Sequence, residues 1–171
     1  MKHGGKLAIL TILIVGAALG SFGWLWQVSQ GRKALEAWGA DSAMVIRYGA
    51  KAELSILSAD APGEADARKL RLGGVTVYAS RPQDVSAAQD LIHYRRALVD
   101  DYAFDWSDPP GASRDDAPAQ WTHALKIDDG KATRTLAFDF SRNVVRLVET
   151  GQELRLEKIT AAKLAGFFKQ Q

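Results

Sequence analysis

The chain of 171 residues contains no cysteine, and this absence removes several kinds of chemistry. Without thiols it cannot form disulfides, hold zinc or iron–sulfur clusters through thiolates, or use a thiol nucleophile. The absence does not decide the compartment, because a domain of this size can be stable without disulfides in an oxidising or a reducing environment.

An excess of charge of one sign is also missing. The chain has 22 basic and 20 acidic residues, and without Lys2 and Lys6 of the N-terminal tail the numbers are equal, 20 and 20. A neutral domain without a long Lys/Arg run lacks the basic surface that nucleic-acid binding needs. We therefore expect no nucleic-acid partner.

Catalytic and cofactor motifs are missing as well. Ser42, Ser80 and Ser141 stand in neither a G-x-S-x-G nor an S-x-x-K setting. The pair Gly73-Gly74 lacks the further glycine and the lysine of a phosphate-binding loop. The acidic residues between 105 and 116 lack the spacing of a calcium loop. We expect no catalytic residue, no metal and no cofactor.

A hydrophobic run is the most prominent feature that is present. Leu7 to Trp26 is a stretch of twenty residues without a charge. A helix of this length, at a rise of about 1.5 Å per residue, spans a hydrocarbon layer of about 30 Å. The sequence predicts a cytoplasmic tail over residues 1–6 and a transmembrane helix over residues 7–26, with the lipid bilayer as a partner.

The basic tail favours a single-pass protein of the cell membrane, with a cytoplasmic N-terminus and an extracytoplasmic C-terminal domain. Trp24 and Trp26 would then lie at the membrane interface. The alternative is a signal peptide cleaved after small residues such as Ala18 and Gly20, which would leave a secreted or periplasmic protein.

Gly16 and Gly20 form a G-x-x-x-G pair within this run. Glycine is common in membrane helices, and this is the favoured explanation of the pair. The alternative is a homodimer through the helix, because small residues at this spacing let two helices approach closely.

The remaining chain predicts a helical connector over residues 27–50 and one α+β domain over residues 51–171. In the connector, Gly39 separates two helical stretches, and the apolar side chains of both should pack on the domain. These side chains are Leu35, Trp38, Met44, Val45 and Tyr48.

The first half of the domain predicts strands on both sides of Gly73-Gly74, which form either a hairpin turn or a bulge. A helix is expected over residues 84–100, capped by Asp84. Residues recurring at spacings of three and four form its buried stripe. They are Ala88, Leu91, Ile92, Arg95, Leu98 and Val99.

The second half predicts a β-meander, because four strand-like runs alternate with tight-turn compositions. His123 should share the core face of the first run with Trp121, Leu125 and Ile127. The opposite face carries Thr133, Thr135, Arg146 and Arg155 for contact with solvent or a partner. The expected fold is α+β, an antiparallel sheet of about five to seven strands with helices on one side, preceded by the transmembrane helix.

Three function classes follow. The favoured one is a membrane-anchored, non-catalytic accessory or protein-interaction module with a membrane or extracytoplasmic protein partner. The alternatives are a small-ligand-binding or sensor domain, and a hydrolase that uses His93 or His123 with an acidic neighbour.

Overall fold

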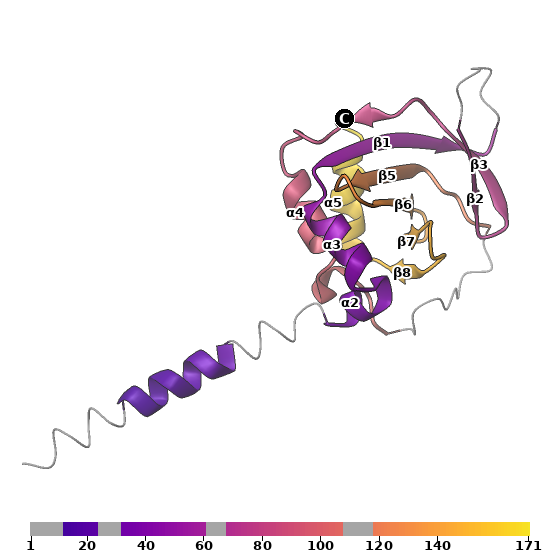
Figure 1. Cartoon of the computed structure of the whole chain (residues 1–171). Coiled ribbons are helices and arrows are strands. Elements are labelled where there is room, and N and C mark those ends of the chain that lie inside the picture. Colours follow the sequence, from indigo (N-terminus) through magenta and orange to yellow (C-terminus); the bar gives the residue numbers. More distant parts are fainter. Residues whose placement is uncertain (1–11, 24–31, 61–67, 108–117) are drawn as a thin grey trace, which may run out of the picture.

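The computed structural model describes residues 12–23, 32–60, 68–107 and 118–171 and has an α+β fold (Figure 1). Its eight strands form one antiparallel sheet, in which β2-β3-β1-β5-β6-β7-β8 are successive neighbours and β4 pairs with β1. The expected α+β class and antiparallel sheet are confirmed. The strands are β1 Lys51–Ser58, β2 Arg68–Leu72, β3 Val75–Ala79, β4 Gln83–Asp84, β5 His123–Asp128, β6 Thr133–Asp139, β7 Val144–Leu147 and β8 Glu153–Arg155.

The helices pack against one face of the sheet, to the left of it in Figure 1. The core there is built from alternate strand residues, including Leu125 and Ile127 of β5 and Leu136 and Phe138 of β6, all fully buried. The helices are α2 Arg32–Trp38, α3 Ala40–Tyr48, α4 Leu91–Ala97, the 3-10 helix η1 Asp101–Ala103 and α5 Lys158–Phe168.

The sheet curls, and its second face covers a smaller core. Leu72 and Val77 of the β2–β3 hairpin pack there with Ala137 of β6 and with Trp121. The expectation that Trp121 shares a face with His123 is therefore wrong. β5 begins only at His123, so the alternation of that strand does not reach back to Trp121.

The predicted meander is confirmed, since β5, β6, β7 and β8 pair in sequence. The turn chemistry explains it: Gly130 and Gly151 adopt φ of 85° and 77°, a left-handed conformation that glycine accepts without a clash. Gly73 and Gly74 form a two-residue hairpin turn, because Leu72 pairs directly with Val75.

The structure contradicts the transmembrane helix predicted for the hydrophobic N-terminal run. The described helix covers residues 12–23, and the rest of the run, 7–11 and 24–26, lies outside the described residues. Among the described residues no helix is long and apolar enough to cross a membrane. The transmembrane helix and the single-pass placement in a cell membrane are therefore wrong.

The helix expected over residues 84–100 is also wrong in its first half. Asp84 belongs to β4, and its carboxylate accepts hydrogen bonds from the Ser86 amide and hydroxyl, at 2.9 and 2.6 Å, which makes a turn. The Val85 amide bonds to the Ala52 carbonyl of β1, so helical bonding begins only at α4.

Candidate functional site

Two open grooves lie on either side of α4. The first groove, about 410 Å³, lies between the end of α3, residues 86–88 and one side of α4. The second groove, about 500 Å³, lies between the other side of α4, η1 and the start of α5. The first is lined by Arg47, Tyr48, Gly49, Ser86, Ala87, Ala88, Leu91, Ile92 and Arg95. The second is lined by His93, Tyr94, Ala97, Tyr102, Glu157, Ile159, Thr160 and Lys163.

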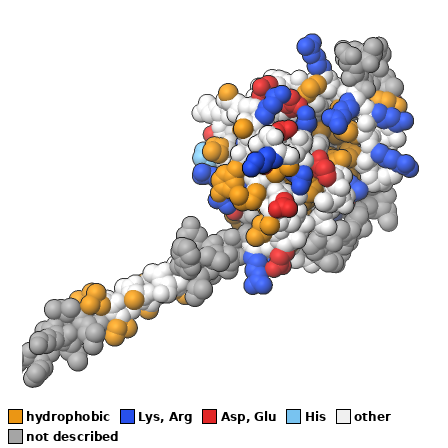
Figure 2. Space-filling model, viewed as in Figure 1, with side chains coloured by type: hydrophobic (Ala, Val, Ile, Leu, Met, Phe, Trp, Pro, Cys, Tyr) orange, Lys and Arg blue, Asp and Glu red, His pale blue; other side chains and the backbone are white. Residues whose placement is uncertain are grey.

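Large apolar side chains are exposed at both grooves. Tyr48 and Ile92 of the first groove are 61% and 53% exposed, and Tyr102 and Ile159 of the second are 63% and 72% exposed. Figure 2 shows hydrophobic side chains gathered over the α3 and α4 region. Scattered exposed apolar residues need no explanation, whereas several around one helix are typical of surfaces that take part in contacts between molecules.

The second groove contains His93, one of the two histidines named for a hydrolase. His93 is exposed and shares the groove with Glu157. Within the described part of the chain, no hydrogen bond or ion pair joins these two side chains. A general base needs a partner that orients its imidazole, and the groove as it stands does not supply one.

The other histidine, His123, lies in an aromatic cluster. Its ring centroid is 5.4 Å from that of Phe168 and 5.7 Å from that of Phe140, and its Nδ1 lies 3.0 Å from the Thr122 hydroxyl. Burial lowers the pKa of His123, and the nearby charge of Lys169 lowers it further. These surroundings favour a neutral imidazole that packs with the core.

Arg95 is the unusual charged residue of the first groove. Its side chain is 8% exposed, and its Nε donates a 2.8 Å hydrogen bond to the Ile46 carbonyl at the end of α3. Its Nη2 is buried without a hydrogen-bond partner, as is the Nε of the neighbouring Arg47. Burial lowers the pKa of the Arg95 guanidinium.

The chain matches no family model, and no curated protein or solved structure is significantly similar to it.

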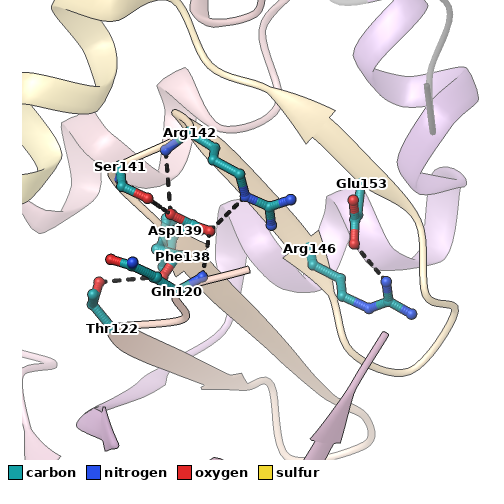
Figure 3. A network of polar contacts seen from close by, with 8 residues as sticks. All are labelled: Gln120, Thr122, Phe138, Asp139, Ser141, Arg142, Arg146 and Glu153. Carbon is teal, nitrogen blue, oxygen red and sulfur yellow. Dashed lines mark hydrogen bonds and ion pairs between the residues drawn. The ribbon is translucent and has the colours of Figure 1, made fainter. Parts of the chain in front are cut away.

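A polar network on the second face of the sheet could be mistaken for a site (Figure 3). Asp139 is fully buried, and its carboxylate accepts bonds from the Ser141 amide and hydroxyl, the Arg142 amide and Nε, and the Gln120 amide. Burial raises the pKa of Asp139, but these hydrogen bonds together outweigh burial and hold it below its ordinary value. Every carboxylate oxygen is occupied, so the network fixes the β6–β7 turn.

The other predicted site residues are not brought together. Gly16 and Gly20 lie on the exposed helix 12–23, and a Cβ placed on either would meet nothing within 4 Å. Their pairing stays a prediction, while Trp24 and Trp26 lie outside the described residues. The described chain holds no group of three His, Cys, Asp or Glu that could bind a metal ion.

The sequence assigned two groove residues to the wrong environment. Tyr48 and Ile92 were expected to be buried, but both line the first groove. Arg95 is buried as its place on the apolar stripe predicts. A charged residue at a buried helical position was the one signal that could have pointed to this groove.

Proposed function

We propose that this domain is a non-catalytic protein-interaction module that docks a partner over α4. The contact region, called here the α4 surface, consists of Tyr48, Ile92, Tyr102 and Ile159 with the two grooves that they line. The observation that carries the proposal is the gathering of four exposed large apolar side chains at two open grooves around one short helix.

The partner should present apolar side chains on an acidic background. Among the described residues, the lining of the first groove includes Arg47 and Arg95 and no acidic residue, and that of the second includes both Lys163 and Glu157. Complementary charge steers such a partner, while burial of a large apolar side chain supplies about 1.5 to 3 kcal/mol. A few such anchors dominate most protein interfaces.

The experiment is site-specific photo-crosslinking of the full chain in its native cells. A photoreactive residue replaces Ile92, Tyr102 or Ile159 in turn. Ile56 of β1, which is 62% exposed and lines neither groove, is the matched control position. We expect all three positions around α4 to yield an adduct with one and the same partner, and Ile56 to yield none.

A second substitution tests whether the partner occupies both grooves at once. With the crosslinker at Ile92 in the first groove, Ile159→Glu in the second groove should remove the adduct, because it buries a charge in the interface. Ile56→Glu should leave the adduct unchanged. Equal adducts from Ile56, or no adduct from any position around α4, would exclude the proposal.

A further inference from the structure

The guanidinium of Arg95 is a buried positive charge without an acidic partner. Among the described residues no carboxylate lies within ion-pair distance of it, and burial is the sole cause of its lowered pKa. A buried charge is costly unless it is paired, and the NH₂ group at Nη2 of this guanidinium has no hydrogen-bond partner. Arg95 therefore lacks the acidic partner that a buried guanidinium usually has.

The carboxylates near the groove do not pair with Arg95. Asp100 interacts with Arg47, which is half-buried on the same groove, and with Arg96. Asp84 interacts with Ser86 and Lys51. Among the described residues no acidic group contributes to the lowered pKa of Arg95, so an anion that enters the groove would be its first acidic partner.

We propose that the first groove binds a carboxylate carried on an apolar chain, with the guanidinium of Arg95 as its main donor. Arg47, half-buried on the same groove, adds a second positive charge to its lining. Ala87, Ala88, Leu91 and Ile92 supply the apolar wall for the chain of the ligand. This inference goes beyond the proposed function, because it holds for a free carboxylate even where no protein docks over α4.

The groove suits a carboxylate on an apolar chain better than inorganic phosphate. A guanidinium binds either anion, so the donors alone do not decide between them. Ala87, Ala88, Leu91 and Ile92 give an apolar chain a surface to cover, whereas inorganic phosphate has no apolar part to place there.

The test is a titration of the full-length protein with sodium hexanoate, followed by calorimetry and by the thermal unfolding midpoint. Sodium phosphate and sodium chloride at equal ionic strength are the reference salts. We expect saturable binding of hexanoate with a rise of the midpoint, and no saturable effect of phosphate. Absence of saturable hexanoate binding, or equal binding of phosphate, would overturn the proposal.

Two pairs of variants assign the binding to the groove. Arg95→Met should weaken hexanoate binding by about tenfold or more, since a hydrogen bond to a charged group is lost, whereas Arg96→Met on the exposed side of α4 should not. Ala87→Glu places a carboxylate at the exposed edge of the groove and should abolish hexanoate binding, while Ala87→Gln should preserve it. Unchanged binding in both Arg95→Met and Ala87→Glu would refute the assignment, and the second variant keeps the test open if the first does not fold.

A third experiment decides whether the carboxylate comes from the chain end of a protein or from a small molecule. The probe is a short apolar peptide with a free C-terminus, and the same peptide with a C-terminal amide is its control. Binding about tenfold tighter than that of hexanoate, lost on amidation, identifies the chain end of a protein; equal binding identifies a free small carboxylate. Failure of the crosslinking experiment with hexanoate binding intact would refute the interaction module and leave this site standing.

Discussion

At the scale of single residues, Asp139 is the buried polar group on which the fold depends most. Asp139→Asn replaces one carboxylate oxygen by an amide NH₂ that faces the donors of Gln120 or Arg142. We expect a loss of about 2 to 4 kcal/mol in the free energy of unfolding, because a buried ion pair with Arg142 is broken. Urea unfolding at pH 7 measures it. Asp129→Asn, in the exposed β5–β6 turn, is the control and should have a much smaller effect.

Asp139 also makes stability depend on pH in the acid range. Because the folded-state pKa of Asp139 is lowered, its contribution is complete above the unfolded value of about 3.9 and is lost as the pH falls through the folded-state pKa. The wild-type protein should therefore lose more stability than Asp139→Asn when the pH is lowered from 5 to 3. Parallel losses in the two proteins would contradict this assignment.

His123 makes stability depend on pH in the same direction, but nearer neutrality. Burial lowers the folded-state pKa of His123, so below about pH 6.5 the unfolded chain binds a proton that the folded chain does not. The free energy of unfolding should fall as the pH drops from 7 to 5, and His123→Phe should remove this slope because phenylalanine packs with Phe140 and Phe168. His93→Gln is the control and should keep it. A wild-type slope in His123→Phe would exclude the explanation.

At the scale of elements, strands were predicted correctly where apolar and polar residues alternate regularly and turn-forming residues separate the runs. The meander was predictable because its strands alternate and its turns contain residues such as Gly130 that accept left-handed backbone. The first half of the domain was not. Residues 84–90 show a helical period, but Asp90 has φ of 68° and Val85 bonds to β1, so long-range pairing overrides the local pattern.

The candidate site could not be predicted from the sequence, for a related reason. Its grooves bring together residues from Arg47 to Lys163, and only the packing of α3, α4 and α5 makes them neighbours. The apolar stripe on α4 correctly predicted that Arg95 is buried. The period of the sequence alone does not tell whether a carboxylate of the same chain pairs with it.

The β7–β8 turn tests how closely backbone and side chain fit within one element. A Cβ on Gly151 would lie 2.9 Å from Nη2 of Arg146, whose Nη1 holds Glu153 at 2.6 Å. Gly130 has a similar φ but open space around it, so Gly130→Ala should cost only the strain of the left-handed backbone, about 1 to 2 kcal/mol. Gly151→Ala should cost more, measured by urea unfolding. The excess should disappear in an Arg146→Met background, and an excess that persists there would point to another cause.

At the scale of the whole molecule, two cores on opposite faces of one curled sheet hold the domain together. All their buried residues lie between Ala34 and Phe168. The helix over residues 12–23 contributes none of them, and its apolar side chains are exposed, from 51% at Val15 to 70% at Ile12. Among the described residues, those that hold the fold together therefore all lie from residue 32 onward.

Removal of residues 1–31 tests this division. We expect the free energy of unfolding to change by no more than about 0.5 kcal/mol, because none of the described residues before 32 belongs to either core. Trp38, Trp106 and Trp121 remain as fluorescent probes of urea unfolding. The shortened protein should also aggregate less, since the exposed apolar helix is gone. A loss of 2 kcal/mol or more, with the same slope in urea, would mean that residues before 32 pack on the domain and that its boundary lies further toward the N-terminus.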